Sequence, residues 1–122
     1  MKLLIVDDSL VIRNKIGRCL LSRFPSIYRA SDGLKAVDIV KQETPDVVTM
    51  DLTMPNMGGV AAVEEILSIA PKTAILVVSA LADKQTAIEA LTKGANGFLC
   101  KPFTQADLTA AIEKVISLRA RS

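Results

Sequence analysis

The sequence predicts an α/β fold in which helices cover both faces of one parallel sheet. Five short apolar runs of strand length alternate with segments of helical length along the 122 residues. Two of these runs, Leu3–Val6 and Ile75–Val78, are continuously apolar, which is typical of strands buried on both faces. Strands that alternate with helices are joined by right-handed crossovers, so the pattern predicts a doubly wound, five-stranded sheet.

Each predicted strand is bounded by turn residues or by a change to helical periodicity. The five predicted strands are Lys2–Val6, Ser26–Ala30, Val47–Met50, Ala74–Val78 and Gly97–Cys100. Prolines separate several of them from the neighbouring helices, as at Pro25 and Pro45. Because a proline disfavours continuation of a helix, these positions are predicted to end the first and second helices.

Apolar residues between the strands recur at every third or fourth position, which is the spacing of one helix face. The five stripes are Ile12, Ile16 and Leu20; Ala36 and Val40; Val60, Val63 and Leu67; Ala87 and Leu91; and Leu108, Ile112 and Ile116. Gly94 is expected to end the fourth helix as a C-terminal glycine. Thr104 and Asp107 have the spacing of a capping box at the start of the fifth helix.

Length and composition indicate one domain that spans residues 1–122. Half of the residues are hydrophobic but only 3% are aromatic, so the core must be built from aliphatic side chains. The formal charge of +2 is evenly spread, which argues against a nucleic-acid-binding face and favours proteins or small ions as partners. The chain has no histidine, and this excludes His-dependent triads, His-ligated zinc and phosphohistidine.

The cysteines and the N-terminus favour a cytoplasmic location. Cys19 and Cys100 are the only cysteines, and two reduced, buried thiols are a better interpretation of them than a disulfide. The first residues, MKLLIVDD, contain too short an apolar run for a signal peptide. No stretch approaches the length of a transmembrane helix, so no membrane association is expected.

Polar residues come directly after four of the five predicted strands. Asp7 and Asp8 come after the first strand, Asp51 after the third, Ser79 after the fourth and Lys101 after the fifth. In a doubly wound sheet the carboxyl ends of the strands lie along one edge, and ligands bind there near the topological switch point. These side chains are therefore expected to converge, although they are scattered over almost the whole chain.

The expected group of side chains suits phosphoryl chemistry. Three carboxylates in one crevice would raise one another's pKa unless a cation intervenes, and Mg²⁺ suits an oxygen-only site with few protein ligands. Lys101 offers a charge and Ser79 a hydroxyl to a phosphoryl group, and Asp51 can be the nucleophile that forms an aspartyl phosphate. Taken alone, each residue has an ordinary alternative as a helix cap, a turn residue or a solvated side chain; their joint occurrence points to function.

Four sequence motifs match a known family. They are IVDDS at 5–9, MDLTMPNMGG at 50–59, VVSA at 77–80 and KPF at 101–103. In this order and spacing, the chain resembles the receiver domain of two-component response regulators over essentially its full length. Within that family it is most similar to the single-domain chemotaxis regulators. The resemblance implies a flavodoxin-like (βα)5 fold with strand order 2-1-3-4-5.

The resemblance also implies a role for each matching residue. Asp51 corresponds to the phosphorylated aspartate, and the metal ligands would be Asp8 directly, Asp7 through water, Asp51 itself and the backbone carbonyl of Thr53. Mg²⁺ would be the cofactor. The remaining residues that the resemblance places at the site are Ser79 and Lys101, which would contact the phosphoryl group, and Pro102, which is expected to come after a cis peptide bond.

Ser79 and Phe98 correspond to the residues that transmit phosphorylation to the surface. Ser79 would move towards the phosphoryl group, and Phe98 would turn into the space that this movement opens. The face formed by the fourth helix, the fifth strand and the fifth helix would then change its binding partner, because a new charge biases a two-state element. A plain core aromatic is an almost equally good interpretation of Phe98.

The predicted function is therefore a phospho-acceptor switch that receives its phosphoryl group from a histidine kinase. Its output would be a downstream protein, such as the flagellar motor switch, and a phosphatase could act on it. The chemistry is confined to Asp51, so the chain is not expected to be an enzyme acting on a pool of substrate. The main alternative is a receiver domain from a longer regulator with a DNA-binding or enzymatic output domain.

Two other functions fit the sequence less well. A phosphatase of the haloacid dehalogenase type would have a second acid two residues after its nucleophile, where this chain has Thr53. A flavodoxin-like electron carrier would have a phosphate-binding loop rich in Ser, Thr and Gly after the first strand. This chain instead has Asp7 and Asp8 there, which would repel a phosphate in the absence of a metal.

Overall fold

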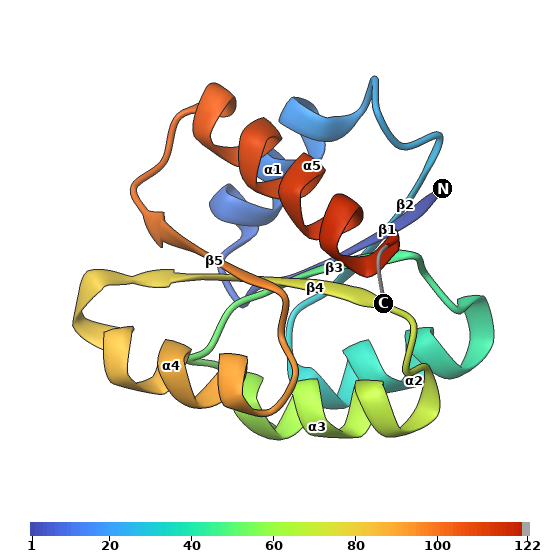
Figure 1. The fold of residues 1–122 in the computed structure, drawn as a ribbon, viewed down its shortest axis with the longest axis vertical. Coiled ribbons are helices and arrows are strands. Elements are labelled where there is room, and N and C mark those ends of the chain that lie inside the picture. The colour runs from blue at the N-terminus through green and yellow to red at the C-terminus, as the bar shows by residue number, and fades with distance from the viewer. Residues whose placement is uncertain (121–122) are drawn as a thin grey trace.

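The computed structural model describes residues 1–120 and has five parallel strands in the order β2-β1-β3-β4-β5. The strands are β1 Lys2–Val6, β2 Ser26–Ala30, β3 Val47–Met50, β4 Ala74–Ala80 and β5 Gly97–Lys101. The α-helices are α1 Leu10–Leu20, α2 Gly33–Glu43, α3 Gly59–Ile69, α4 Lys84–Thr92 and α5 Gln105–Ala120. Helices α1 and α5 cover one face of the sheet, and α2, α3 and α4 cover the other (Figure 1). The predicted fold class and strand order are confirmed.

The two helix layers explain why the strands are continuously apolar. Alternate residues of β1 face opposite layers, so Leu4 belongs to the core under α2, α3 and α4, and Leu3 belongs to the core under α1 and α5. Both side chains are fully buried. A strand that lies between two hydrophobic cores cannot carry a polar residue on either face without cost, so charges are confined to its ends.

Strands β4 and β5 extend further than predicted. Strand β4 ends at Ala80 rather than Val78, and β5 ends at Lys101 rather than Cys100. Parallel pairing of Ser79 with Cys100, and of Ala80 with Lys101, accounts for the extra length. The polar residues Ser79 and Lys101 are thus held by the ladder of the sheet rather than by a loop.

Two predicted helix ends are confirmed in detail. The Asp107 backbone N–H donates to the Thr104 hydroxyl at 3.0 Å, and the Thr104 N–H donates to the Asp107 carboxylate at 3.2 Å. This is the predicted capping box, with aspartate in place of the usual glutamate. Gly94 has φ +118°, a value that favours glycine, and it comes after α4 as expected. A 3₁₀ helix over Leu81–Asp83, which was not predicted, precedes α4.

Thr49 lies in the middle of β3 and carries a buried hydroxyl group. It is 1% exposed, and its Oγ1 makes no hydrogen bond within residues 1–120. Because an unpaired buried hydroxyl loses its bonds to water, we expect Thr49→Val to raise the free energy of unfolding by about 1 kcal/mol in urea denaturation. Thr49→Ser keeps the hydroxyl, loses a methyl group and should destabilise. A Val variant no more stable than the parent would contradict this account.

The two cysteines are free thiols, as predicted, but neither is fully buried. Cys19 and Cys100 are both partly exposed. Cys19 packs against the core under α1 and α5, at its margin rather than inside it. The expectation of two buried thiols is therefore wrong, although the absence of a disulfide between them is confirmed.

Membrane insertion was not expected from the sequence. None of the helices within residues 1–120 combines the length and the apolar character that a membrane crossing requires.

Candidate functional site

The acidic residues meet because β1 and β3 are neighbours in register. Val6 pairs with Met50, so Asp7 and Asp51 are the next residues along each strand. The Asp51 N–H donates to the Val6 carbonyl at 2.9 Å and extends this ladder by one bond. Neither carboxylate depends on a flexible loop for its position, because each directly continues a core strand.

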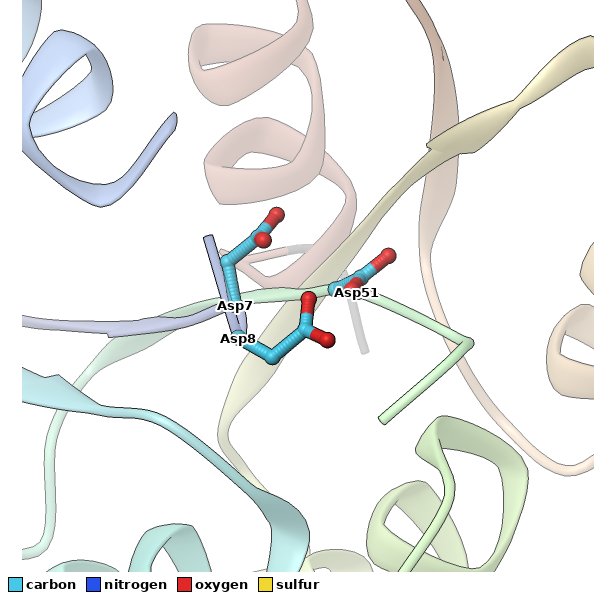
Figure 2. A group of neighbouring side chains, drawn as sticks. All are labelled: Asp7, Asp8 and Asp51. Atoms are coloured by element: carbon cyan, nitrogen blue, oxygen red, sulfur yellow. The ribbon is translucent and has the colours of Figure 1, made fainter. Parts of the chain in front are cut away.

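The three predicted acidic residues form one cluster. Carboxylate oxygens of Asp7, Asp8 and Asp51 lie within 4.8 Å of one another. Figure 2 shows Asp7 and Asp8 at the end of β1, with the Asp51 carboxylate close to them at the end of β3. Asp7 and Asp51 are buried, whereas Asp8 is exposed. A group of oxygen donors of this kind, open on one side, suits a hard divalent cation that retains several waters.

Lys101 reaches this cluster from β5. Its Nζ lies 2.8 Å from Asp7 Oδ2 and 3.4 Å from Asp51 Oδ1. Burial opposes the charged ammonium, but its hydrogen bond to Asp7 and the negative charge of Asp51 together raise the pKa of Lys101 above its ordinary value. The peptide bond between Lys101 and Pro102 is cis. The ammonium therefore holds two buried carboxylates together.

The charges of this site are not fully balanced. Burial, and then the negative charge of Asp7, raise the pKa of Asp51 to about 6, although Lys101 opposes the shift. One ammonium faces three carboxylates, so the site retains negative charge. A further positive charge placed beside Asp51 would therefore stabilise its ionised form.

Comparison with known proteins identifies the family. Residues 3–113 match the model of the response regulator receiver domain. The chain belongs to this family. It is 37% identical to the chemotaxis protein CheY of Thermotoga maritima over 115 residues, which are 93% of this chain and 96% of that protein. Receiver domains are signalling domains of two-component systems, and the predicted membership of this family is confirmed.

Other relatives are similar to this receiver domain in different contexts. It is 39% identical over 121 residues to the protein-glutamate methylesterase/protein-glutamine glutaminase 2 of Photobacterium profundum, and the match covers 96% of this chain but 30% of that protein. The solved structure of Vibrio cholerae CheY4 is 30% identical, with a TM-score of 0.85, and 93% of this chain and 97% of that one are covered. Receiver domains similar to this chain thus occur both as short proteins and within longer ones.

In this receiver domain, Ser79 lies near the carboxyl end of β4, along the edge of the sheet that carries the acidic cluster. Its side chain is fully buried, and its hydroxyl makes no hydrogen bond within the described part of the chain. A buried hydroxyl of this kind can donate to an oxygen that arrives at the site. Phe98 is half-buried on β5 and packs against the core under α2, α3 and α4.

The loop after Asp51 is fastened to the start of α2, and this was not predicted. Asn56 has φ 67°, and its Nδ2 donates to Asp32 Oδ2 at 2.9 Å. The Gly33 N–H donates to the Met57 carbonyl at 3.3 Å, and a Cβ on Gly33 would come within 2.6 Å of that oxygen. These contacts fix the loop that carries Thr53. Asparagine tolerates the left-handed backbone conformation that this turn requires. The run MPNMGG, which contains Asn56, was therefore the signal for the turn in the sequence.

A divalent cation held by the acidic cluster is expected to bind less tightly as the pH is lowered through about 6, to which the pKa of Asp51 is raised without metal. Below this pH the cation must displace a proton, so affinity should fall by about tenfold per pH unit. Titration calorimetry at pH values on either side of the pKa measures this. Unchanged affinity would contradict direct participation of Asp51.

The same raised pKa has the opposite effect on folding without metal. A carboxyl whose folded-state pKa lies above its unfolded value binds its proton more tightly when folded. The stabilising contribution of Asp51 is therefore present below its ordinary pKa and is lost as the pH rises through about 6. Cation binding by Asp51 and the contribution of Asp51 to folding without metal are therefore expected to respond to pH in opposite directions.

Proposed function

We propose that this receiver domain is a phosphorylation switch that accepts a phosphoryl group on Asp51 from a histidine kinase. One observation carries the proposal: three carboxylates and the Lys101 ammonium meet at the carboxyl ends of β1, β3 and β5, where the pKa of the buried Asp51 is raised to about 6. Such a shift marks a carboxyl in an electrostatically demanding position, as reactive groups often are. The family assignment supports the same interpretation.

Mg²⁺ is the proposed cofactor. Asp7, Asp8 and Asp51 provide the carboxylate oxygens, and the backbone carbonyl of Thr53 is the fourth proposed protein contact. When bound, the ion supplies positive charge that keeps Asp51 ionised and reduces repulsion of an incoming phosphoryl group. The Thr53 side chain is exposed and its hydroxyl donates to Asp83 at 3.3 Å, so it is the backbone of this residue that is proposed to act.

The proposed reaction takes place on the chain itself. A carboxylate oxygen of Asp51 attacks the phosphorus, the bond from phosphorus to the donor histidine nitrogen breaks, and an acyl phosphate forms. Lys101 pairs with the phosphoryl oxygens. Ser79 donates its hydroxyl hydrogen to another of these oxygens, and its lack of a hydrogen-bond partner within residues 1–120 supports this role. Hydrolysis returns Asp51 to its free state, so no separate substrate pool is consumed.

The proposed output lies on the face formed by α4, β5 and α5. Movement of Ser79 towards the phosphoryl group opens space for Phe98, which lies on β5 beside that face. Exposed apolar side chains are already present on α4, where Ile88 is 46% exposed and Leu91 39%. The proposed partner is a downstream protein, such as the flagellar motor switch, and a phosphatase ends the signal.

A second function is favoured by the longer relatives. The chain is 31% identical to the regulatory protein AtoC of Escherichia coli, of which the match covers 26%. A receiver domain in that context would control an attached output domain instead of a separate protein. The chemistry proposed at Asp51 is the same in both cases, and the two proposals differ only in where the output lies.

A beryllofluoride experiment tests the proposed switch. Beryllofluoride with Mg²⁺ mimics the phosphoryl group on an aspartate, so we expect amide NMR shifts at Ser79, Phe98 and α4. A pull-down with and without the mimic should then capture different partners. The Asp51→Asn variant, to which beryllofluoride cannot attach in this way, should show neither effect. Identical spectra with and without the mimic would refute the switch.

A further inference from the structure

A pocket of about 270 Å³ opens at the free edge of the sheet, beside the end of β2. We call it the basic pocket, and its lining residues are Leu10, Arg13, Arg29, Ala30, Ser31 and Lys35. They come from the start of α1, the end of β2 and the first turn of α2. Three of the six are cations and none is acidic, although the formal charge of the chain is only +2.

The three cations of the basic pocket form no ion pair within residues 1–120. Arg13 donates from Nη1 to the backbone carbonyl of Asp7 at 2.6 Å, and Lys35 donates from Nζ to the Ser31 hydroxyl at 3.0 Å. These acceptors are neutral, so the hydrogen bonds orient the positive charges without neutralising them. Oriented cations that are not fully neutralised attract a carboxylate or phosphate strongly.

Gly17 makes room for the third cation. A Cβ on this residue of α1 would lie 2.6 Å from Arg29 Nη2 and 3.4 Å from Arg29 Cζ. The guanidinium therefore lies directly against the backbone of α1. An arginine on an edge strand also discourages pairing with another sheet, but that role alone does not require Arg13 and Lys35 to line the same pocket.

Among the carboxylates nearest in the chain, Asp32 partly offsets the charge of Lys35, whereas Asp7 is bonded to groups outside the pocket. Asp7 accepts from Lys101 at 2.8 Å and from the Ser9 N–H at 2.9 Å. Asp32 accepts from the Lys35 N–H and from Asn56, each at 2.9 Å; these bonds, the backbone one first, and then the charge of Lys35 lower its pKa. Asp8 belongs to the acidic cluster with Asp7 and Asp51.

One exposed aliphatic side chain lines the basic pocket, and two more are adjacent to lining residues in the sequence. Leu10, which lines it, is 60% exposed, and its neighbour Val11 is 73% exposed. Leu34 precedes Lys35 at the start of α2 and is 50% exposed. Large apolar side chains that are exposed together with oriented charges are characteristic of protein–protein contacts rather than of sites for small ions.

We infer that the basic pocket docks an acidic segment of a partner protein, with a carboxylate among Arg13, Arg29 and Lys35 and an aliphatic side chain against Leu10. A free phosphate would satisfy the cations and leave the aliphatic side chains exposed. A nucleic acid would need a longer basic track than three side chains provide. The surface is separate from the face of α4, β5 and α5, and its use does not require phosphorylation of Asp51.

The test uses the full chain without Mg²⁺ or a phosphodonor, so it is independent of the proposed switch. The probe is a short synthetic peptide that alternates pairs of glutamate and leucine residues. We expect it to shift the amide NMR signals of residues 10–13 and 29–35. Arg29→Gln and Lys35→Gln should each weaken binding by about tenfold, since each removes one charge-assisted contact. Lys114→Gln, the same charge change on the exposed face of α5, should have little effect.

Several results would overturn the inference. The first is peptide binding that Arg29→Gln and Lys114→Gln weaken equally, which would indicate a general charge effect. The second is equal binding of a matched peptide with glutamine in place of glutamate. The third is binding of inorganic phosphate, an oligonucleotide or phosphatidylserine vesicles at this pocket where the acidic peptide does not bind. Absence of any peptide-induced shift in residues 10–13 and 29–35 would also refute it.

Discussion

The Asp51→Asn variant is expected to accept no phosphoryl group. The amide is a poor nucleophile, and its substitution also removes one of the three carboxylates of the proposed Mg²⁺ site. Incubation with acetyl phosphate and Mg²⁺, followed by intact mass measurement, should show the added phosphoryl mass on the parent protein and only background on the variant. Loss of labelling should be complete rather than partial, because Asp7, the other buried carboxylate of the cluster, is already held by Lys101 at 2.8 Å and by the Ser9 N–H at 2.9 Å.

Loss of labelling in this variant should not arise from unfolding. Ionised Asp51 is unfavourable in the metal-free fold, since its pKa is raised to about 6, so the neutral amide should be at least as stable near pH 7. Asp38→Asn, the same change on the exposed face of α2, is the matched control and should label normally. A phosphoryl group found on another residue of the Asn variant would overturn the assignment of Asp51.

Most of the fold could be predicted because its strands lie between two cores. The runs of β1 and β4 leave no polar face, and this alone favours a parallel sheet covered by helices on both sides. The strand ends were harder to predict, because polar Ser79 and Lys101 remain in the ladder through their pairing with Cys100 and Ala80. A polar residue marks the edge of a core, but hydrogen bonding of the backbone continues beyond it.

The acidic cluster could also be predicted, because the register of two paired strands fixes which residues lie next to each other at their ends. Once β1 and β3 are adjacent, Asp7 and Asp51 must lie together. The closer contact of Lys101 with Asp7 than with Asp51 was not predictable, since it depends on side-chain conformations at the rim. The basic pocket was not predictable either. Its cations come from three separate elements, and nothing in their spacing along the chain indicates that they meet.

Lys101→Met should destabilise the protein in the absence of Mg²⁺ and should do so much less in its presence. Methionine keeps a long, flexible side chain but removes the ammonium from two buried carboxylates. Leaving buried charges without their partner costs several kcal/mol when burial is complete, and Lys101 is partly exposed, so we expect a loss of about 2 kcal/mol in urea denaturation. Lys93→Met, which disrupts an exposed pair with Glu64, should cost under about 0.5 kcal/mol.

Recovery of stability with Mg²⁺ is the more informative half of this experiment. If the ion binds among the same carboxylates, it replaces the lost positive charge and stabilises the folded state in proportion to its occupancy. The variant should then gain more stability from Mg²⁺ than the parent, because in the parent the ammonium already neutralises part of the site. Equal gains in both proteins would mean that the ion and Lys101 act on different groups, and the shared site proposed for Asp7, Asp51 and Lys101 would fail.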